Sequence, residues 1–276
     1  MLQPHVPDSP SDAWDALDRC RWMGTPRRIY ESIDSTNIAA SAWARGGAPN
    51  GAIVIADYQT AGRGRHQRAW QAEPGKNLLF SLILRPVLPL ERVSVLPLLA
   101  GLAAARAIDG FASPVVVSLK WPNDVYIDGK KCGGMLLESS QSGGLQQPPE
   151  FIVLGIGINV NQASFPDPIA SSATSLVLET GRFVARDALL AHLLIELETM
   201  YDQMGNDDAL ARLLGEYESR MYRFGEQVDV RVAGGGAGYR GFIEGVSPGG
   251  ALQLRTEEGV VSLHAGEVTL RPLPHA

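Results

Sequence analysis

The sequence predicts an α+β fold in which a large domain of sheet and helices precedes a small all-β domain. Two observations predict it. From Ile29 onward, short apolar strands alternate with amphipathic helical stretches. After Tyr222, the helical pattern ends and short β-prone segments follow, separated by glycine-rich turns. The 276 residues are enough for both, at roughly 100–200 residues per domain.

We therefore divide the chain into a tail (1–24), a central domain (25–222) and a C-terminal β domain (223–276). The tail is rich in Pro, Asp and Ser, with a short amphipathic piece around Trp14 and Leu17. We expect it to be loosely ordered, and it is too short for a three-helix DNA-reading module.

The elements of the central domain follow from apolar periodicity. Strands are predicted at residues 52–56, 78–84, 115–119, 125–127, 135–138 and 151–158. Helices are predicted at residues 38–45, 92–108, 186–204 and 207–217. Strong N-cap residues precede the first of these helices, and Pro97 suits the first turn of the second.

Turn and loop signals complete the assignment. Asp128-Gly129, between two β-prone segments, is typical of a hairpin turn. Residues 143–149 read as a polar hairpin loop, and residues 161–175 as a long loop. Structureless loops of about 12–15 residues are uncommon unless they are functional or mobile. In the β domain, strands are predicted at residues 227–232, 239–246, 251–255 and 260–264.

Composition excludes several classes of protein. With 45% hydrophobic and 20% charged residues, the chain is expected to be soluble and globular, and a net charge of −6 argues against a general nucleic-acid binder. Cys20 and Cys132 form neither a disulfide framework nor a zinc site, so we expect a reducing compartment. No basic residue precedes Arg19, unlike in a secretory signal, and the most apolar stretch (93–105) is shorter than the ~18 residues of a membrane span. We expect a cytoplasmic location without a membrane partner.

The most informative segment is YQTAGRGRHQRAW, residues 58–70. It places three arginines and two glycines within seven residues. The glycines let the backbone approach a ligand closely, and guanidinium groups suit phosphate and carboxylate oxygens. A solvated basic loop or an RGG-like nucleic-acid segment is the alternative. The isolation of these charges in an acidic chain counts against that alternative.

A second segment is KWPNDVYIDGKKCGG, residues 120–134. Asp124 and Lys131 lie on opposite arms of the predicted hairpin, so they could approach each other and a shared ligand. Taken alone, these residues favour an ordinary exposed hairpin tip. The neighbouring Gly133 and Gly134 instead suit a backbone packed closely against a ligand.

A third segment, GIGINVN, covers residues 155–161. Glycines at alternate strand positions often mark the close approach of a ligand or of another backbone, and tight sheet–helix packing would explain them equally well. The spacing is not GxGxxG and no helix follows, which argues against a dinucleotide site.

A fourth segment is Asp34-Ser35-Thr36-Asn37. Helix capping alone would explain every one of these residues. Their hydroxyl and amide groups could also bind a polar ligand head group.

Other catalytic patterns are missing from the sequence. His5, His192, His264 and His275 have no metal-ligand spacing, and His66 reads as a bystander. No Ser/His/Asp set or Walker A motif is present. The identity of any metal ligand stays open.

In this order, the motifs resemble those of the biotin protein ligase family, over roughly residues 25–272. KWPND followed by Lys131, with GRGR at this distance before it, carries most of the resemblance. The resemblance is to the monofunctional type without an N-terminal DNA-binding domain. It implies a class II synthetase-like (biotin–lipoate ligase) fold, with a central mixed sheet and helices, and a C-terminal SH3-like β-barrel.

The resemblance also implies roles for individual residues. Biotin contacts are implied at Ser35, Thr36, Asn37, Gln59, Gly62, Arg63, Gly64, Arg65, Lys131, Gly133 and Gly134. ATP contacts are implied at Arg65, Arg68, Trp70, Asn123, Asp124, Lys131 and Asn159. For catalysis, the chemistry of joining two anions makes Lys131 and Arg65 the candidates to offset charge, and Asp124 is the candidate to orient or deprotonate an acceptor amine.

The implied reaction is the ATP-dependent activation of biotin to biotinyl-5′-AMP, with Mg²⁺, followed by transfer to a lysine of a biotin carboxyl carrier domain. We expect a monomer or weak homodimer that does not bind DNA. Gln67 departs from the family pattern G-R-G-R-x-G-R, and we expect it to alter closure of the loop. A lipoate or octanoate ligase of the same fold, and a non-enzymatic biotin sensor or nucleic-acid binder, are the alternatives.

Overall fold

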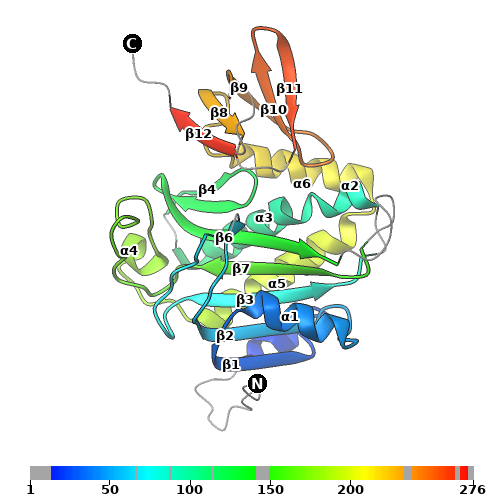
Figure 1. Cartoon of the computed structure of the whole chain (residues 1–276), viewed down its shortest axis with the longest axis vertical. Coiled ribbons are helices and arrows are strands. Elements are labelled where there is room, and N and C mark those ends of the chain that lie inside the picture. The colour runs from blue at the N-terminus through cyan, green and yellow to red at the C-terminus, as the bar shows by residue number, and fades with distance from the viewer. Residues whose placement is uncertain are drawn as a thin grey trace.

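A computed structural model describes residues 14–65, 68–86, 89–112, 115–140, 149–232, 238–264 and 268–272. Its larger sheet has seven strands in the order β1-β2-β3-β7-β6-β5-β4 (Figure 1). They are β1 (Arg27–Ile33), β2 (Ile53–Gln59), β3 (Leu78–Leu84), β4 (Val117–Lys120), β5 (Asp124–Ile127), β6 (Lys130–Ser139) and β7 (Ile152–Ile158). β1 and β2 are parallel and the other neighbours are antiparallel, so the expected mixed sheet is confirmed.

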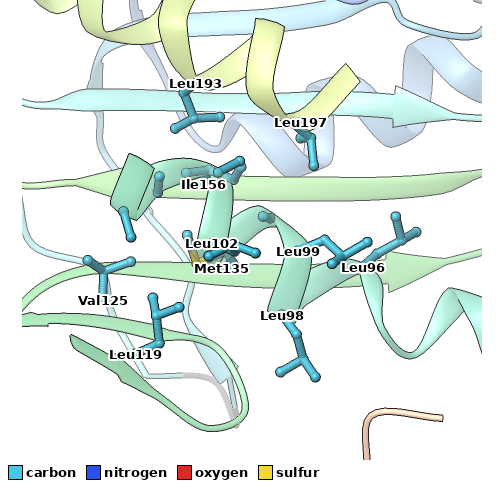
Figure 2. Close-up of a cluster of buried hydrophobic side chains, with 14 of the residues drawn as sticks. Leu96, Leu98, Leu99, Leu102, Leu119, Val125, Met135, Ile156, Leu193 and Leu197 are labelled. Atoms are coloured by element: carbon cyan, nitrogen blue, oxygen red, sulfur yellow. The ribbon is translucent and has the colours of Figure 1, made fainter. Parts of the chain in front are cut away.

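Helices cover both faces of this sheet (Figure 1). They are α1 (Thr36–Arg45), α2 (Leu90–Val93), α3 (Leu96–Ala112), α4 (Leu176–Thr180), α5 (Arg186–Gln203) and α6 (Asp207–Ser219). Figure 2 shows leucines of α3 and α5 packed with Met135 and Ile156 of the sheet. α1 lies on the opposite face, where Ala40 and Ala44 pack against Val54 and Val153.

The period-2 alternation of β7 separates the two faces. Ile152, Leu154, Ile156 and Ile158 belong to the cluster formed with α3 and α5. Val153 packs against α1, and the next positions on that face are glycines 155 and 157. Because glycine has no side chain, these two positions leave room on the α1 face of the sheet.

The β5–β6 hairpin has the predicted turn. Asp128 and Gly129 have φ of 48° and 73°, as a type I′ turn requires at both central residues. The pairing shifts register between Val125 and Tyr126, which marks a β-bulge.

The helix predicted at residues 92–108 is interrupted. α2 ends at Val93 and α3 begins at Leu96, with Pro97 in the first turn of α3 as expected. By length and composition alone, the stretch Glu91–Ala112 could cross a membrane. The shorter apolar stretch 93–105, which was identified from the sequence, is too short for this. Of the 18-residue window that meets this criterion, 72% is buried inside the protein, as expected for a core helix.

The end of the N-terminal segment is packed rather than loosely ordered, which corrects the expectation for residues 14–24. A 3-10 helix, η2 (Trp14–Arg19), places Leu17 in the core, and Met23 is also fully buried. Glu198 of α5 accepts backbone N–H bonds from Arg21, Trp22 and Met23 at 3.1, 2.7 and 2.9 Å. Periodicity missed this anchor because Glu198 is 177 residues away from Arg21 in sequence.

The C-terminal residues form a five-stranded sheet in the order β11-β10-β9-β8-β12. Its strands are β8 (Gln227–Val232), β9 (Gly238–Val246), β10 (Leu252–Thr256), β11 (Gly259–Leu263) and β12 (Val268–Pro272); β12 was not predicted. The sheet docks on the central domain: Trp121 Nε1 donates to the Gly250 carbonyl at 2.8 Å, and the Val246 amide donates to Glu218 at 2.8 Å. Trp121 of the KWPND motif is therefore buried at the junction.

Candidate active site

A cavity of about 360 Å³ opens on the α1 face of the sheet, where glycines replace side chains on β7. It is enclosed by the start of α1, the end of β2, strands β3, β6 and β7, and two loops. The polar residues and glycines of the lining include Ser35, Thr36, Asn37, Gln59, Arg63, Gly64, Arg65, Arg68, Trp70, Lys120, Asn123, Asp124, Lys131, Gly134, Gly155, Gly157 and Asn159.

The start of α1 turns its polar side chains inward. Ser35 is the N-cap residue, yet its side chain makes no capping hydrogen bond. Thr36 donates both its backbone amide and its hydroxyl to Gln59 Oε1, at 2.8 and 3.1 Å. Capping alone therefore does not account for this segment, because the buried Thr36 connects the first turn of α1 to the end of β2.

Asn37 links three strands around the cavity. Its Oδ1 accepts from Ser81 Oγ at 2.6 Å, and its Nδ2 donates to Glu138 at 2.8 Å. A Cβ atom on Gly155 would lie 2.1 Å from Asn37 Oδ1, so only glycine leaves space for this amide. Glu138 also pairs with Arg63 at 3.5 Å.

The described residues of the arginine segment, 62–65 and 68–70, pair with each other in antiparallel fashion, and we call these two stretches the arginine hairpin. Arg63 and Ala69 form an antiparallel bridge, and the Gly64 amide donates to the Arg68 carbonyl at 2.7 Å. Arg65 Nη1 donates to Asn123 Oδ1 at 3.1 Å, which joins the hairpin to the KWPND motif. His66 and Gln67 lie outside the described residues.

Lys131 and Asp124 meet in the same cavity. The Lys131 Nζ lies 2.6 Å from Asp124 Oδ1 and 5.6 Å from the centre of the Trp70 ring. The bulge sets this geometry: Asp124 pairs with Gly134 in the ladder, while Lys131 pairs with Tyr126. The sequence-based expectation that the two arms of the hairpin bring these groups together is confirmed.

Among the described residues, two buried side-chain polar atoms at the cavity have no hydrogen-bond partner. They are Trp70 Nε1, a donor, and Asn159 Oδ1, an acceptor. The Trp70 ring lies against β7, where a Cβ on Gly157 would be 2.7 Å from Cε2. Buried polar groups are normally satisfied, so a donor and an acceptor left over beside one cavity indicate a polar ligand.

The loop of residues 161–175 lies along β6 at Lys131. The Lys131 amide donates to the Ser172 carbonyl at 2.8 Å, and the Thr174 amide donates to the Lys131 carbonyl at 2.9 Å. Phe165, Ile169 and Ala173 add apolar surface to the lining. An apolar wall beside cationic groups suits a ligand with a flat ring and an anionic group.

Cationic groups dominate the electrostatics of the lining. Five lining residues carry guanidinium or ammonium groups, namely Arg63, Arg65, Arg68, Lys120 and Lys131, whereas Asp124 is the lining carboxylate. Burial lowers the pKa of Lys120, and the positive charge of Lys131 lowers it further. The negative charge of Asp124 raises this pKa and so partly offsets the shift. Such a concentration of charge in a chain of net charge −6 favours an anionic ligand.

Most residues singled out from sequence meet at this cavity, but two glycines do not line it. Gly62 lies against the Trp70 carbonyl and Gly133 against the Gly157 carbonyl, so both serve backbone packing. Sequence reasoning assigned no role to Lys120, Ser81 or Glu138. The position of Lys120 within the KWPND motif could have indicated its place at the cavity. The residues next to Ser81 and Glu138 in sequence give no indication of their contacts with Asn37.

No group of three or more His, Cys, Asp or Glu side chains that could hold a metal ion occurs among the described residues. Asn159 Oδ1 and Asn123 Oδ1 are oxygen donors at the cavity.

Residues 29–159 match the biotin/lipoate A/B protein ligase family, and residues 224–271 match the biotin protein ligase C-terminal domain. The chain is 36% identical over 251 residues to the bifunctional ligase/repressor BirA of Bacillus spizizenii, covering 90% of this chain and 75% of that protein. The chain belongs to the biotin protein ligase family. Two further members support this placement.

The biotin–[acetyl-CoA-carboxylase] ligase of Mycobacterium tuberculosis is 35% identical over 244 residues, which cover 87% of each chain. The biotin protein ligase of Aquifex aeolicus, solved in complex with biotin and ATP, has 32% identity and a TM-score of 0.77; the match covers 90% of this chain and all of that one. The family, first indicated by the motif order, is thereby confirmed, and so is the predicted mixed sheet with helices of the ligase fold.

Proposed function

We propose that the protein activates biotin with ATP to biotinyl-5′-AMP and transfers the biotinyl group to a lysine of a biotin carboxyl carrier domain. The observation that carries the proposal is the meeting of the arginine hairpin with the Lys131–Asp124 pair at one cavity, in a chain of this family. The two unpartnered buried polar atoms there are suited to a polar ligand.

The first step joins two anions. A biotin carboxylate oxygen attacks the α-phosphorus of ATP, the bond to the β-phosphate oxygen breaks, and pyrophosphate leaves with its electron pair. At a separation of 4 Å, two like charges repel by about 4 kcal/mol at an effective dielectric of 20. Lys131 and Arg65, both at the cavity, would offset this repulsion and stabilise the charge that develops on the α-phosphate.

We assign the two substrates to the two sides of the cavity. The biotin side comprises Ser35, Thr36, Asn37, Gln59, Arg63, Gly64, Arg65, Lys131 and Gly134, with Gly62 and Gly133 supporting the backbone behind them. The ATP side comprises Arg65, Arg68, Trp70, Asn123, Asp124, Lys131 and Asn159. We expect the arginine hairpin and the loop of residues 161–175 to exclude water from the intermediate.

Mg²⁺ is part of the proposal as the ion that accompanies ATP. When bound, it would supply positive charge at the phosphates, with Asn123 and Asn159 as the available amide oxygens. The chain's own cations act on the same oxygens, so the role of Lys131 does not depend on the ion.

In the second step, the acceptor amine attacks the biotinyl carbonyl and AMP leaves. The acceptor must be neutral to attack, and we propose that Asp124 orients it and takes its proton. The ion pair between Asp124 and Lys131 holds this carboxylate in place. Once Lys131 turns towards the phosphate, Asp124 is available to the incoming ammonium group.

The remaining assignments are part of the same proposal. We propose a catalytic domain at residues 25–222 and an SH3-like barrel at 223–276, supported by the small antiparallel C-terminal sheet. We also propose a cytoplasmic protein that acts as a monomer or weak homodimer and does not bind DNA. Analytical ultracentrifugation with and without biotin would test the oligomeric state.

The experiment that tests the function is mass spectrometry of a carrier domain after incubation with the protein, biotin, ATP and Mg²⁺. We expect the carrier to gain one biotinyl group on one lysine, and omission of ATP to abolish the gain. An unmodified carrier, with no pyrophosphate released from biotin and ATP, would refute the proposal.

Two controls separate the alternatives. Replacing biotin with lipoate or octanoate tests whether the protein is instead a ligase for one of those acids. Calorimetry with each acid measures which of them the protein binds most tightly. Salt-sensitive DNA binding without turnover would favour a non-enzymatic binder instead.

A further inference from the structure

The two segments that border the nucleotide side of the cavity are joined by one buried amide. Gln162 follows β7 at the start of the loop of residues 161–175, and it is 2% exposed. It does not line the main cavity. It lies at an adjoining, shallower hollow of about 350 Å³, which shares Gln71 and Phe165 with that cavity.

Both ends of the Gln162 amide are used. Its Oε1 accepts from the Glu73 backbone amide at 3.1 Å and from Asn77 Nδ2 at 2.5 Å. Its Nε2 donates to the Ser164 carbonyl at 2.9 Å. One side chain therefore connects the segment that continues from the arginine hairpin with the loop on the other side of the hollow.

Neighbouring contacts connect Gln162 to the site itself. Ser175 Oγ donates to the Gln162 carbonyl at 2.6 Å, which closes the loop end to end. Between these ends, the loop is hydrogen-bonded to both backbone groups of Lys131. On the other side, Glu73 follows Trp70 by three residues, and the Trp70 ring rests against Gly157.

We infer that Gln162 is a positioning residue that couples the arginine hairpin to the loop of residues 161–175, so that the intermediate is retained only when both segments are held together. The inference rests on the proposed function and assigns Gln162 no contact with a substrate. An amide is suited to the task because it offers an acceptor to one segment and a donor to the other, without the cost of burying a charge.

The test compares three variants in the full chain, with biotin, ATP and Mg²⁺ and without a carrier domain. Gln162→Met keeps the length of the side chain and removes all three hydrogen bonds, whereas Gln162→Glu keeps the acceptor towards Glu73 and Asn77. Asn206→Ala is the matched control, because Asn206 caps α6 through a 2.9 Å bond from the Ala209 amide, and loss of that cap destabilises the fold without affecting either segment.

The decisive measurement is the rate at which biotinyl-AMP appears free in solution, set against the melting temperature. We expect Gln162→Met to raise this release about five- to tenfold and to raise KM for ATP, with a smaller effect for Gln162→Glu. Asn206→Ala should lower Tm by a similar amount and leave release unchanged.

Equal release from the Gln162 variants and the wild type would overturn the inference. So would a rise in Asn206→Ala as large as that in Gln162→Met, since release would then follow global stability. If Gln162→Met does not fold, Gln162→Glu alone decides by the same comparison. Failure of the wild type to make biotinyl-AMP would instead refute the proposed function, so the two failures are distinguishable.

Discussion

The two faces of the large sheet carry different tasks, although the same strands form both. On the face covered by α3 and α5, β7 presents four large aliphatic side chains that are nearly or fully buried. On the α1 face, the same strand presents glycines at positions 155 and 157, next to Asn37 and Trp70. The first face contributes hydrophobic stability, and the second gives up part of that packing to make a polar cavity. The contrast predicts that substitutions on β7 and its neighbours affect either stability or catalysis, according to the face.

The largest effect is expected from Lys131→Ala, on the cavity face. Removing this ammonium group should lower the rate of biotinyl-AMP formation by about 10²–10³-fold, because charge on the α-phosphate is no longer offset. Single-turnover adenylation with labelled ATP measures it. Lys130→Ala, the exposed neighbour at the hairpin turn, is the control and should be unaffected. A normal rate in Lys131→Ala would remove the central assignment.

On the packed face, Leu154→Ala should lower the stability of the protein rather than its activity. Leu154 is fully buried, so the cavity left behind should cost about 2–5 kcal/mol of unfolding free energy. Urea denaturation measures the loss, and KM for biotin should stay the same. A raised KM without a loss of stability would show that the two faces are not separate.

Gly157→Ala adds a single methyl group to the cavity face of the same strand. Its Cβ would lie 2.7 Å from Trp70 Cε2, so the indole must move and the arginine hairpin with it. We expect kcat/KM for adenylation to fall about 10- to 100-fold, since small misplacements of catalytic groups have effects of this size. Gly110→Ala, within α3 and with nothing within 4 Å, should instead add about 0.5–1 kcal/mol of stability. Equal activity in both variants would contradict the role given to Trp70.

The smallest effect concerns the anchor of the N-terminal segment on α5. Burial raises the pKa of Glu198, but the three backbone amides and Arg21 outweigh it, so the net pKa lies below the usual value. A lowered pKa contributes stability above the unfolded pKa of about 4.3, and this stability is lost as the pH falls through the folded pKa. At pH 7, Glu198→Gln should therefore be less stable than the wild type by about 1–3 kcal/mol.

That difference should narrow as the pH falls below the unfolded pKa, because the wild type then loses the stability that its charged carboxylate contributes. Thermal unfolding of both proteins between pH 7 and pH 3 measures it. A gap that does not narrow as the pH falls below the unfolded pKa would show that lost packing, rather than charge, destabilises the variant.

Local sequence predicted most of the helices and strands and the residue types that gather at the cavity. A mainly apolar run, interrupted only by Ser81, predicted β3 from Leu78 to Leu84, and Asp128-Gly129 predicted the type I′ turn, because these signals depend on residues adjacent in the chain. The order of GRGR, KWPND and Lys131 was enough to indicate the family and the convergence of Lys131 with Asp124.

Only the tertiary structure decided which distant groups meet. The contact of Glu198 with residues 21–23, the links of Asn37 to Ser81 and Glu138, and the junction at Gln162 each join residues far apart in sequence. The bulge that offsets β5 from β6 left no local signal either. The physical reason is that burial and hydrogen-bond satisfaction depend on the whole fold, whereas propensity and periodicity report only on neighbours along the chain.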